Sequence, residues 1–482
     1  MRRPNPPCIS YLVPVDGIER NEQKPRVPRW AAMLAAGALL SPLGFYIASL
    51  RDSGGDPIAS FPETVETGAP DPFDEPASIL SCFPTEDLEP VQASTLDEQI
   101  DGVERAVERL RELRSKKRVP ITLLSPEDVA ARLEGDQLEG LSPREIDRDT
   151  RILEILGVVP EGTDLEELAG QLSGQIVGYY DTDARELFVN AGSAGSKDET
   201  LPPAGEVTLA HELEHAIADQ SFGLPLRVNA PPSKADAALA GRSLVEGDAT
   251  LLTRHYATSV LSSEQISELQ SDPATKNALQ DAEQIPPAIQ LLFEFPYTHG
   301  LSFVCDLFGE GGWRAIDRAY ERPPSTTAQV MFPARYRARE GAVGIVGFGE
   351  LERPWKRLGG SAVGASDLYA LFSAPGGAPS RSLDDPTASA AGWAGGAVEV
   401  WSKGKESALG MALEEREPED GLCDSVHAWY RVGFPEGEQV AGADGDVMVA
   451  KAPGRVALLS CRGSEVRLGI GPTLPTARAL ID

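Results

Sequence analysis

VTLAHELEHAIADQSFG, residues 207–223, contains the pattern H-E-x-x-H and ends at a glycine. Its apolar residues recur at helical spacing, and glycine commonly follows the last turn of a helix, so the stretch predicts a helix from Glu206 to about Gln220. Residues four positions apart lie on the same helix face. His211 and His215 can therefore present two imidazole nitrogens to one metal ion, at the Zn–N distance of about 2.0–2.1 Å.

Glu212 lies about 100° around the helix from His211, beside the predicted ion, where it can accept a proton from metal-bound water. The spacing therefore predicts Glu212 as the catalytic general base. Glu214 occupies an unconstrained position of the pattern, and we expect it to be a solvated charge. The pattern also arises by chance in on the order of one chain in a few hundred of this composition, so a third metal ligand is required.

The third ligand is expected on the next helix, KADAALAGRSLVEGDATLLTRHYATSVL, residues 234–261, with Ser233 as its N-cap. Glu246 shares a face with small and apolar residues, where an unpaired carboxylate is costly and a metal ion removes the cost. Asp248 is the alternative ligand, but it points more than half a turn away. We favour Glu246 as ligand and expect Asp248 to accept a hydrogen bond from a ligand imidazole. For Asp219 the same role competes with a plain helix-end function.

Other polar residues are weaker candidates. Tyr297 and His299 in FPYTHG, residues 295–300, are candidate donors to an oxyanion, unless FPY simply begins a packed helix. We expect His255 and His427 to be structural or surface residues. Two β-prone runs, 175–180 and 186–190, flank the turn-rich DTDAR and predict a hairpin before the H-E-x-x-H helix.

HELEH followed by a helix with EGDA resembles the gluzincin zinc metallopeptidases, whose third ligand is a glutamate on the following helix. The chain is also similar to a group of poorly characterised bacterial exported proteins. That similarity rests on QIVGYYD, AHELEHAIADQSF, LVEGDAT, FPYTHGLSF, GGWRAIDRAYERPPSTTAQ and AAGWAGG, between residues 175 and 396. The chain differs from these proteins at three positions outside the metal ligands: Ala328, Phe332 and Gly396.

The resemblance implies a zincin-like fold in which the hairpin lines a substrate cleft. It also implies a single Zn²⁺ held by His211, His215 and Glu246, beside the base Glu212. We therefore expect a zinc metallopeptidase that acts on a peptide or protein substrate. The alternative is a non-catalytic binding or scaffold protein that retains a zincin fold, and a zinc hydrolase of other amides or esters is a third hypothesis.

The N-terminal region predicts a membrane anchor. Residues 30–50, WAAMLAAGALLSPLGFYIASL, are uncharged and long enough to cross about 30 Å of hydrocarbon. Basic residues precede this segment and acidic residues follow it, which places residues 1–29 in the cytoplasm and the catalytic part outside it. Secretion after signal cleavage is the alternative. Residues 51–95 are rich in Pro, Gly and acids and predict a disordered linker.

Composition and cysteines complete the expectations. The net charge of −30 argues against a nucleic-acid partner. We expect an α+β fold class, with a mainly helical metallopeptidase domain over 96–338 that includes a small hairpin or sheet, and a smaller α/β domain over 339–482. Cys423 and Cys461 are expected to form a disulfide in an oxidising compartment. Cys305 is expected to be a small buried hydrophobe, and Cys82 to lie in the linker.

Overall fold

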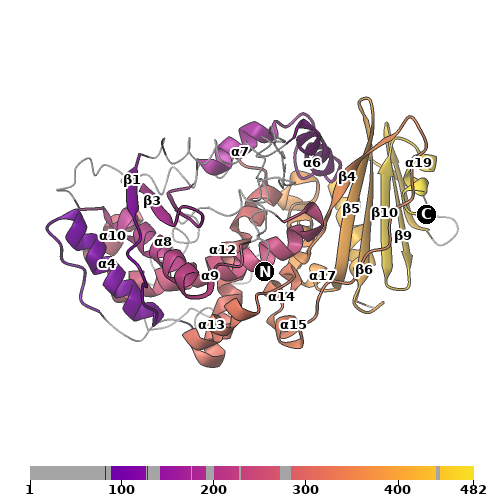
Figure 1. The fold of residues 1–482 in the computed structure, drawn as a ribbon. Coiled ribbons are helices and arrows are strands. Elements are labelled where there is room, and N and C mark those ends of the chain that lie inside the picture. The colour runs from indigo at the N-terminus through magenta and orange to yellow at the C-terminus, as the bar shows by residue number, and fades with distance from the viewer. Residues whose placement is uncertain are drawn as a thin grey trace, which may run out of the picture.

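The computed structural model has a mixed α+β fold (Figure 1). It describes residues 82, 88–125, 128, 142–174, 176–190, 200–226, 230–271, 284–418, 420–440 and 446–482. The expected cytoplasmic tail 1–29, the expected anchor 30–50 and most of the expected linker 51–95 lie outside these residues. None of the helices within the described ranges has the length and apolar character needed to cross a membrane.

The helical half of the molecule consists of long helices packed around α8 and α9. Its helices are α4 (Leu96–Arg111), α8 (Pro203–Phe222), α9 (Ala235–Ser259), α10 (Ser263–Ser271), α12 (Pro287–Gly311), α13 (Trp313–Glu321), α14 (Thr327–Met331) and α15 (Pro333–Ala338). Almost all of α8 and α9 is buried, because α4, α10, α12 and α13 surround them (Figure 1). This burial on all sides explains why neither helix has a single apolar stripe opposite a polar, solvated face.

Two glycines allow α9 and α12 to cross at close range. A Cβ on Gly247 would collide with the carbonyl oxygen of Gly300, and one on Gly300 with the carbonyl oxygen of Ser243. The glycine of the EGDA stretch is therefore required by packing, and it fixes the position of the neighbouring Glu246. FPY lies in the middle of α12 and not at its start, so the expectation that it begins a helix was wrong.

A three-stranded sheet lies against α8. The strands β1 (Ile121–Leu124), β2 (Gly178–Asp181) and β3 (Glu186–Asn190) have the order β1-β3-β2, with β1 parallel and β2 antiparallel to β3. The expected hairpin is thus present, and β2 is the edge strand next to α8. Ser233 lies in a 3₁₀ turn, η1 (Pro232–Lys234), and the start of α9 has no side-chain cap, contrary to our expectation.

The C-terminal half is built on a seven-stranded antiparallel sheet with the order β4-β5-β6-β10-β9-β8-β7. The strands are β4 (Lys356–Ala362), β5 (Trp393–Lys403), β6 (Glu406–Glu415), β7 (Glu438–Val440), β8 (Asp446–Ala452), β9 (Arg455–Arg462) and β10 (Glu465–Gly471). One face carries α16 (Ala365–Ser373), η2 (Pro375–Gly377), η3 (Pro379–Arg381), α17 (Pro386–Ala390) and α18 (Leu422–Gly433), and the other carries α19 (Leu474–Ala479).

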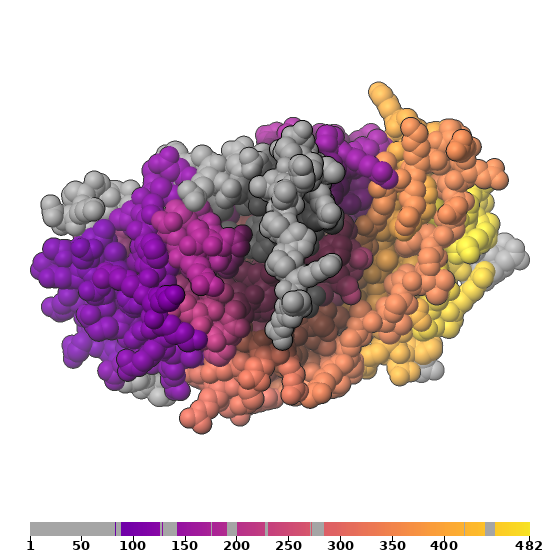
Figure 2. Space-filling view, viewed as in Figure 1, coloured from indigo at the N-terminus to yellow at the C-terminus, as the bar shows by residue number. Residues whose placement is uncertain are grey.

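The two halves share one hydrophobic cluster. The helices α6 (Pro143–Ile155) and α7 (Leu165–Ser173) precede α8 in the chain, yet their apolar residues pack in the same cluster as the C-terminal sheet and α18. Trp401 and Trp429 are buried in the C-terminal half. Figure 2 shows α4 and its neighbours at one end of the molecule and the C-terminal sheet at the other.

Two disulfides join distant parts of the chain. Cys423 in α18 is bonded to Cys461 in β9, the pair expected from the sequence. The second disulfide joins Cys82 to Cys305 in α12. Cys305 is buried as expected, but it is not a simple hydrophobe, and Cys82 is attached to the helical half. Sequence reasoning missed this pair because 223 residues separate its members.

Candidate metal centre

His211 and His215 on α8 and Glu246 on α9 lie together in the interior. One ligand atom from each falls within 4.8 Å of the others, and the side chains are 2–9% exposed. Glu246 Oε2 is 3.4 Å from His211 Nε2 and 3.3 Å from His215 Nε2. Ligands bonded to one tetrahedral Zn²⁺ at about 2.05 Å are separated by about 3.3 Å. The spacing of these atoms therefore fits a shared ion.

The carboxylate of Glu246 gives a second sign that the site suits a cation. Its Oε2 atom is buried and makes no hydrogen bond among the described residues. The distances of 3.3 and 3.4 Å to the imidazoles are longer than the usual range for N–H···O hydrogen bonds. A buried carboxylate oxygen without a hydrogen bond is costly, and a metal ion removes that cost. Of the two acids weighed on this helix, Glu246 is the one beside the imidazoles.

Thr253, two turns after Glu246 on α9, fixes the orientation of His211. The Thr253 hydroxyl donates to the carbonyl oxygen of Ala249 at 2.7 Å, so its oxygen accepts from His211 Nδ1 at 3.1 Å. The proton of the neutral ring is then on Nδ1, which leaves the lone pair of Nε2 directed toward Glu246. Burial lowers the pKa of His211 to about 4, so the ring is neutral at pH 7. Sequence reasoning did not assign Thr253 this role.

His215 and Glu246 form a charged pair in the metal-free protein. Burial alone would lower the pKa of His215, but the negative charge of Glu246 outweighs it and raises the pKa to about 9. Burial alone would raise the pKa of Glu246, but the two imidazoles outweigh it and lower the pKa to about 2. A metal ion bound between these side chains would have to displace the proton from His215.

Glu212 lies between the candidate metal ligands and the edge strand β2. Its carboxylate accepts a hydrogen bond from the backbone N–H of Tyr180, and its Oε2 is buried without a hydrogen bond among the described residues. Burial raises the pKa of Glu212 to about 8 in the absence of a metal. The strand approaches closely because residue 178 is glycine, since a Cβ there would lie 2.7 Å from Thr208 Cγ2. The geometry provides a carboxylate with one oxygen held and one available.

Glu214 is fully buried, so the expectation of a solvated charge was wrong. It lies between His215 and Arg111, the last residue of α4, whose guanidinium is also fully buried. Arg111 Nε is 3.4 Å from Glu214 Oε1, and Glu214 Oε2 is 3.8 Å from His215 Nδ1. Periodicity could not reveal this contact, because a third helix, α4, supplies the cation that compensates the buried carboxylate.

Asp248 and Asp219 bind partners other than the imidazoles. Asp248 accepts from Arg111 at 3.1 and 2.9 Å and from the Tyr320 hydroxyl at 2.9 Å, so it lies one step further from the metal ligands than expected. Asp219 accepts from the Tyr180 hydroxyl at 3.0 Å and from the backbone N–H of Leu224 at 3.2 Å. Asp219 therefore combines a helix-end function with attachment of the strand that holds Glu212.

Of the two candidate oxyanion donors, Tyr297 is the nearer to the ligands. Its buried ring lies 6.4 Å from the ring of His211, centroid to centroid. The ring of His299 stacks on Phe295 and contacts Tyr369 edge-on. Sequence reasoning missed Arg242, a buried cation one turn before Glu246. Burial lowers its pKa to about 10, against the raising effect of Glu246 and Tyr297.

The remaining histidines are structural or distant. His255 is buried, and its Nε2 pairs with the carbonyl oxygen of Cys82 at 2.7 Å, which ties the start of the described chain to α9. His427 is half-buried on α18 in the C-terminal half. Neither belongs to the metal cluster.

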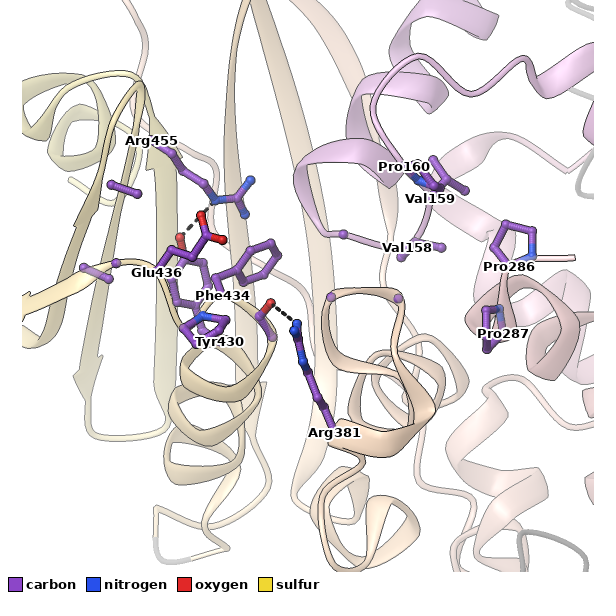
Figure 3. Close-up of a pocket in the computed structure, with 18 of the residues that line it drawn as sticks. Val158, Val159, Pro160, Pro286, Pro287, Arg381, Tyr430, Phe434, Glu436 and Arg455 are labelled. Atoms are coloured by element: carbon purple, nitrogen blue, oxygen red, sulfur yellow. Dashed lines mark hydrogen bonds between the residues drawn. The ribbon is translucent and has the colours of Figure 1, made fainter.

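A separate cavity of about 670 Å³ lies between the α6–α7 connection, the start of α12 and α18 (Figure 3). None of its lining residues is a metal ligand. The two arginines that line it bind the protein itself: Arg455 donates to Ile155 O and Tyr430 Oη and lies over the Phe434 ring, and Arg381 donates to Gly433 O. The bond from Arg455 to Ile155 joins β9 to the end of α6, whereas the other contacts lie within the C-terminal half.

Comparisons with protein-family models, with curated proteins and with solved structures found no match to this chain.

Proposed function

We propose that this protein is a zinc-dependent metallopeptidase with a zincin-like helical half, and that residues 30–50 anchor it in a membrane with the catalytic part outside the cytoplasm. The observation that carries the proposal is the buried triangle of His211, His215 and Glu246, whose spacing suits one tetrahedral ion. The adjacent Glu212 adds a general base, which the hydrolysis of an amide requires.

Bound in the triangle, zinc would lower the pKa of a coordinated water and polarise the scissile carbonyl. The residues of the chain supply the proton transfers. Glu212 accepts the proton of the attacking water on the carboxylate oxygen that makes no hydrogen bond, while the Tyr180 N–H holds the carboxylate in place. It then donates this proton to the leaving amine, so that water is added across the C–N bond and an acid and an amine are released.

Thr253 and Tyr297 support this chemistry. Thr253 keeps the Nε2 lone pair of His211 directed at the ion, as the hydrogen-bond chain to Ala249 requires. Tyr297, beside His211, is the candidate donor to the oxyanion that forms on the carbonyl. The buried position of the site excludes bulk water, which strengthens each of these electrostatic contacts.

The test compares two carboxylates on α8. In the full-length chain, Glu212→Gln should abolish cleavage of an unbiased peptide library and retain zinc, measured by elemental analysis. The control is Glu206→Gln, a buried acid of the same helix that accepts from Gln99 and Tyr256 away from the ligands. It should retain both zinc and cleavage, whereas Glu246→Ala should lose both.

Two outcomes would reject the proposal. Full cleavage in Glu212→Gln would exclude the mechanism, since an amide side chain cannot accept the proton of water. A wild-type protein that holds zinc but cleaves no peptide would favour the non-catalytic binding protein.

A further inference from the structure

The space behind His215 is occupied by a buried charge network that the proposed chemistry does not use. Arg111 and the side chains of Glu214 and Asp248 are 0% exposed, and the side chain of Asp317 is 28% exposed. The guanidinium lies 3.4 Å from Glu214, 2.9 Å from Asp248 and 2.9 Å from Asp317, and its Cζ atom lies over the Trp313 ring, 4.7 Å from the ring centroid. One cation thus faces three acids at the join of α4, α8, α9 and α13.

Asp248 and Glu214 differ in the hydrogen bonds that they accept. Asp248 accepts two hydrogen bonds from Arg111 and a third from Tyr320. Glu214 faces the carboxyl of Asp248, and burial together with this neighbour raises the pKa of Glu214. Its two carboxylate oxygens are buried and accept no hydrogen bond from an N–H donor among the described residues, and His215 Nδ1 is likewise buried without a hydrogen bond there. Each such atom costs about 1–3 kcal/mol when it stays without a partner. Glu214 Oε2 and His215 Nδ1 lie 3.8 Å apart, so an approach of about 1 Å would give each a partner.

The charges around His215 also favour a hydrogen bond between its Nδ1–H and Glu214. With Glu214 ionised, the three acids around one guanidinium leave surplus negative charge on the Nδ1 side of His215. A divalent cation on the Nε2 side of the same ring supplies the opposite charge, and it makes the Nδ1–H a stronger donor. The buried Glu214 is therefore stabilised by a metal at the His215 position more than by the guanidinium alone.

We propose that Glu214 is the positioning residue of His215: it accepts from Nδ1–H, Arg111 holds it in place, and together they orient the ring and strengthen its bond to the metal. This inference rests on the proposed metal site. In the metal ligand pair, His211 is oriented by the neutral Thr253 and His215 by a carboxylate, so the two imidazoles differ in basicity. Glu214 touches no substrate and acts only through His215.

The experiment measures metal affinity, which does not depend on cleavage. In the full-length chain, Zn²⁺ affinity is determined by competition with a chelator, and Co²⁺ is bound in its place to record the visible absorption bands that report ligand geometry. Glu214→Gln keeps the size of the side chain and removes its charge. We expect its Zn²⁺ affinity to fall about 10–100-fold and its Co²⁺ bands to shift.

The matched control is again Glu206→Gln, which neutralises a buried carboxylate on the same helix but away from the imidazoles. It should lower stability without changing the Zn²⁺ affinity or the Co²⁺ bands. A purely structural role of Glu214 would make the two variants behave alike.

Failure of this inference is distinct from failure of the proposed function. If Glu214→Gln binds Zn²⁺ and Co²⁺ as the wild type does, the positioning role is overturned and the metal site stands. If the wild type binds Zn²⁺ no more tightly than Glu246→Ala, the metal site itself is rejected. If Glu214→Gln does not fold, Glu214→Asp decides: it retains the charge but withdraws the carboxylate by one methylene, and unchanged affinity in that variant overturns the role.

Discussion

Zinc affinity should rise about tenfold per pH unit between pH 6.5 and 9, because the ion and a proton compete for His215. In the metal-free protein, burial lowers the pKa of His215, but the negative charges of Glu246, Glu212 and Glu214 outweigh it and raise the pKa to about 9. The imidazole is therefore protonated below pH 9, and only the neutral form can bind a metal ion. Affinity must fall as the pH falls.

The magnitude follows from the distance between the working pH and this pKa. At pH 7 about 1% of the metal-free protein has a neutral His215, so the apparent affinity is lowered about 100-fold, or about 2.7 kcal/mol. An imidazole with the ordinary pKa of about 6.5 would lower it by less than about twofold. His211 adds nothing at this pH, because burial lowers its pKa to about 4.

Two measurements check this prediction. Zn²⁺ affinity is determined by chelator competition from pH 6 to 9.5, and the imidazoles of the metal-free protein are titrated by NMR. One imidazole should titrate near pH 9 and another should stay neutral down to about pH 4. Affinity that is constant above pH 7, together with an ordinary pKa for His215, would refute the reasoning.

Three further predictions concern stability, each measured by urea unfolding. Arg111→Met should lower the free energy of unfolding by about 3–5 kcal/mol at pH 7, because it leaves buried carboxylates without their cation, and the loss should shrink at pH 5, where they take up protons. Gly247→Ala should lower the free energy of unfolding by about 1–3 kcal/mol, since its Cβ would meet the backbone of α12. Gly170→Ala on α7, where a Cβ would meet nothing within 4 Å, should instead raise it by up to about 1 kcal/mol. Equal effects of the two substitutions would contradict the packing argument. Cys82→Ser should lower stability by about 2–5 kcal/mol, and the difference from wild type should vanish under reducing conditions, which open the Cys82–Cys305 bond that only the wild type has.

The sequence predicted what one or two neighbouring elements determine. The spacing of His211 and His215 places them on one face of a helix whatever surrounds it, because the helical repeat is local. The same reasoning located Glu246 on the next helix, since a carboxylate among small and apolar residues requires compensation when it is buried. The hairpin beside Glu212 also follows from a local pattern, because β-prone runs and turn residues act over a few positions.

The tertiary structure alone decided which side chains meet across helices. Glu214 is an acidic residue at one of the x positions of H-E-x-x-H, so nothing in the local sequence distinguishes it from a surface residue. It is buried because α4 brings Arg111 against it from about a hundred positions earlier in the chain. Thr253, Arg242 and the bond between Cys82 and Cys305 depend in the same way on how α9 and α12 pack. Periodicity specifies the face of an element, whereas the partner of that face is set by the packing of the whole core, which no single segment encodes.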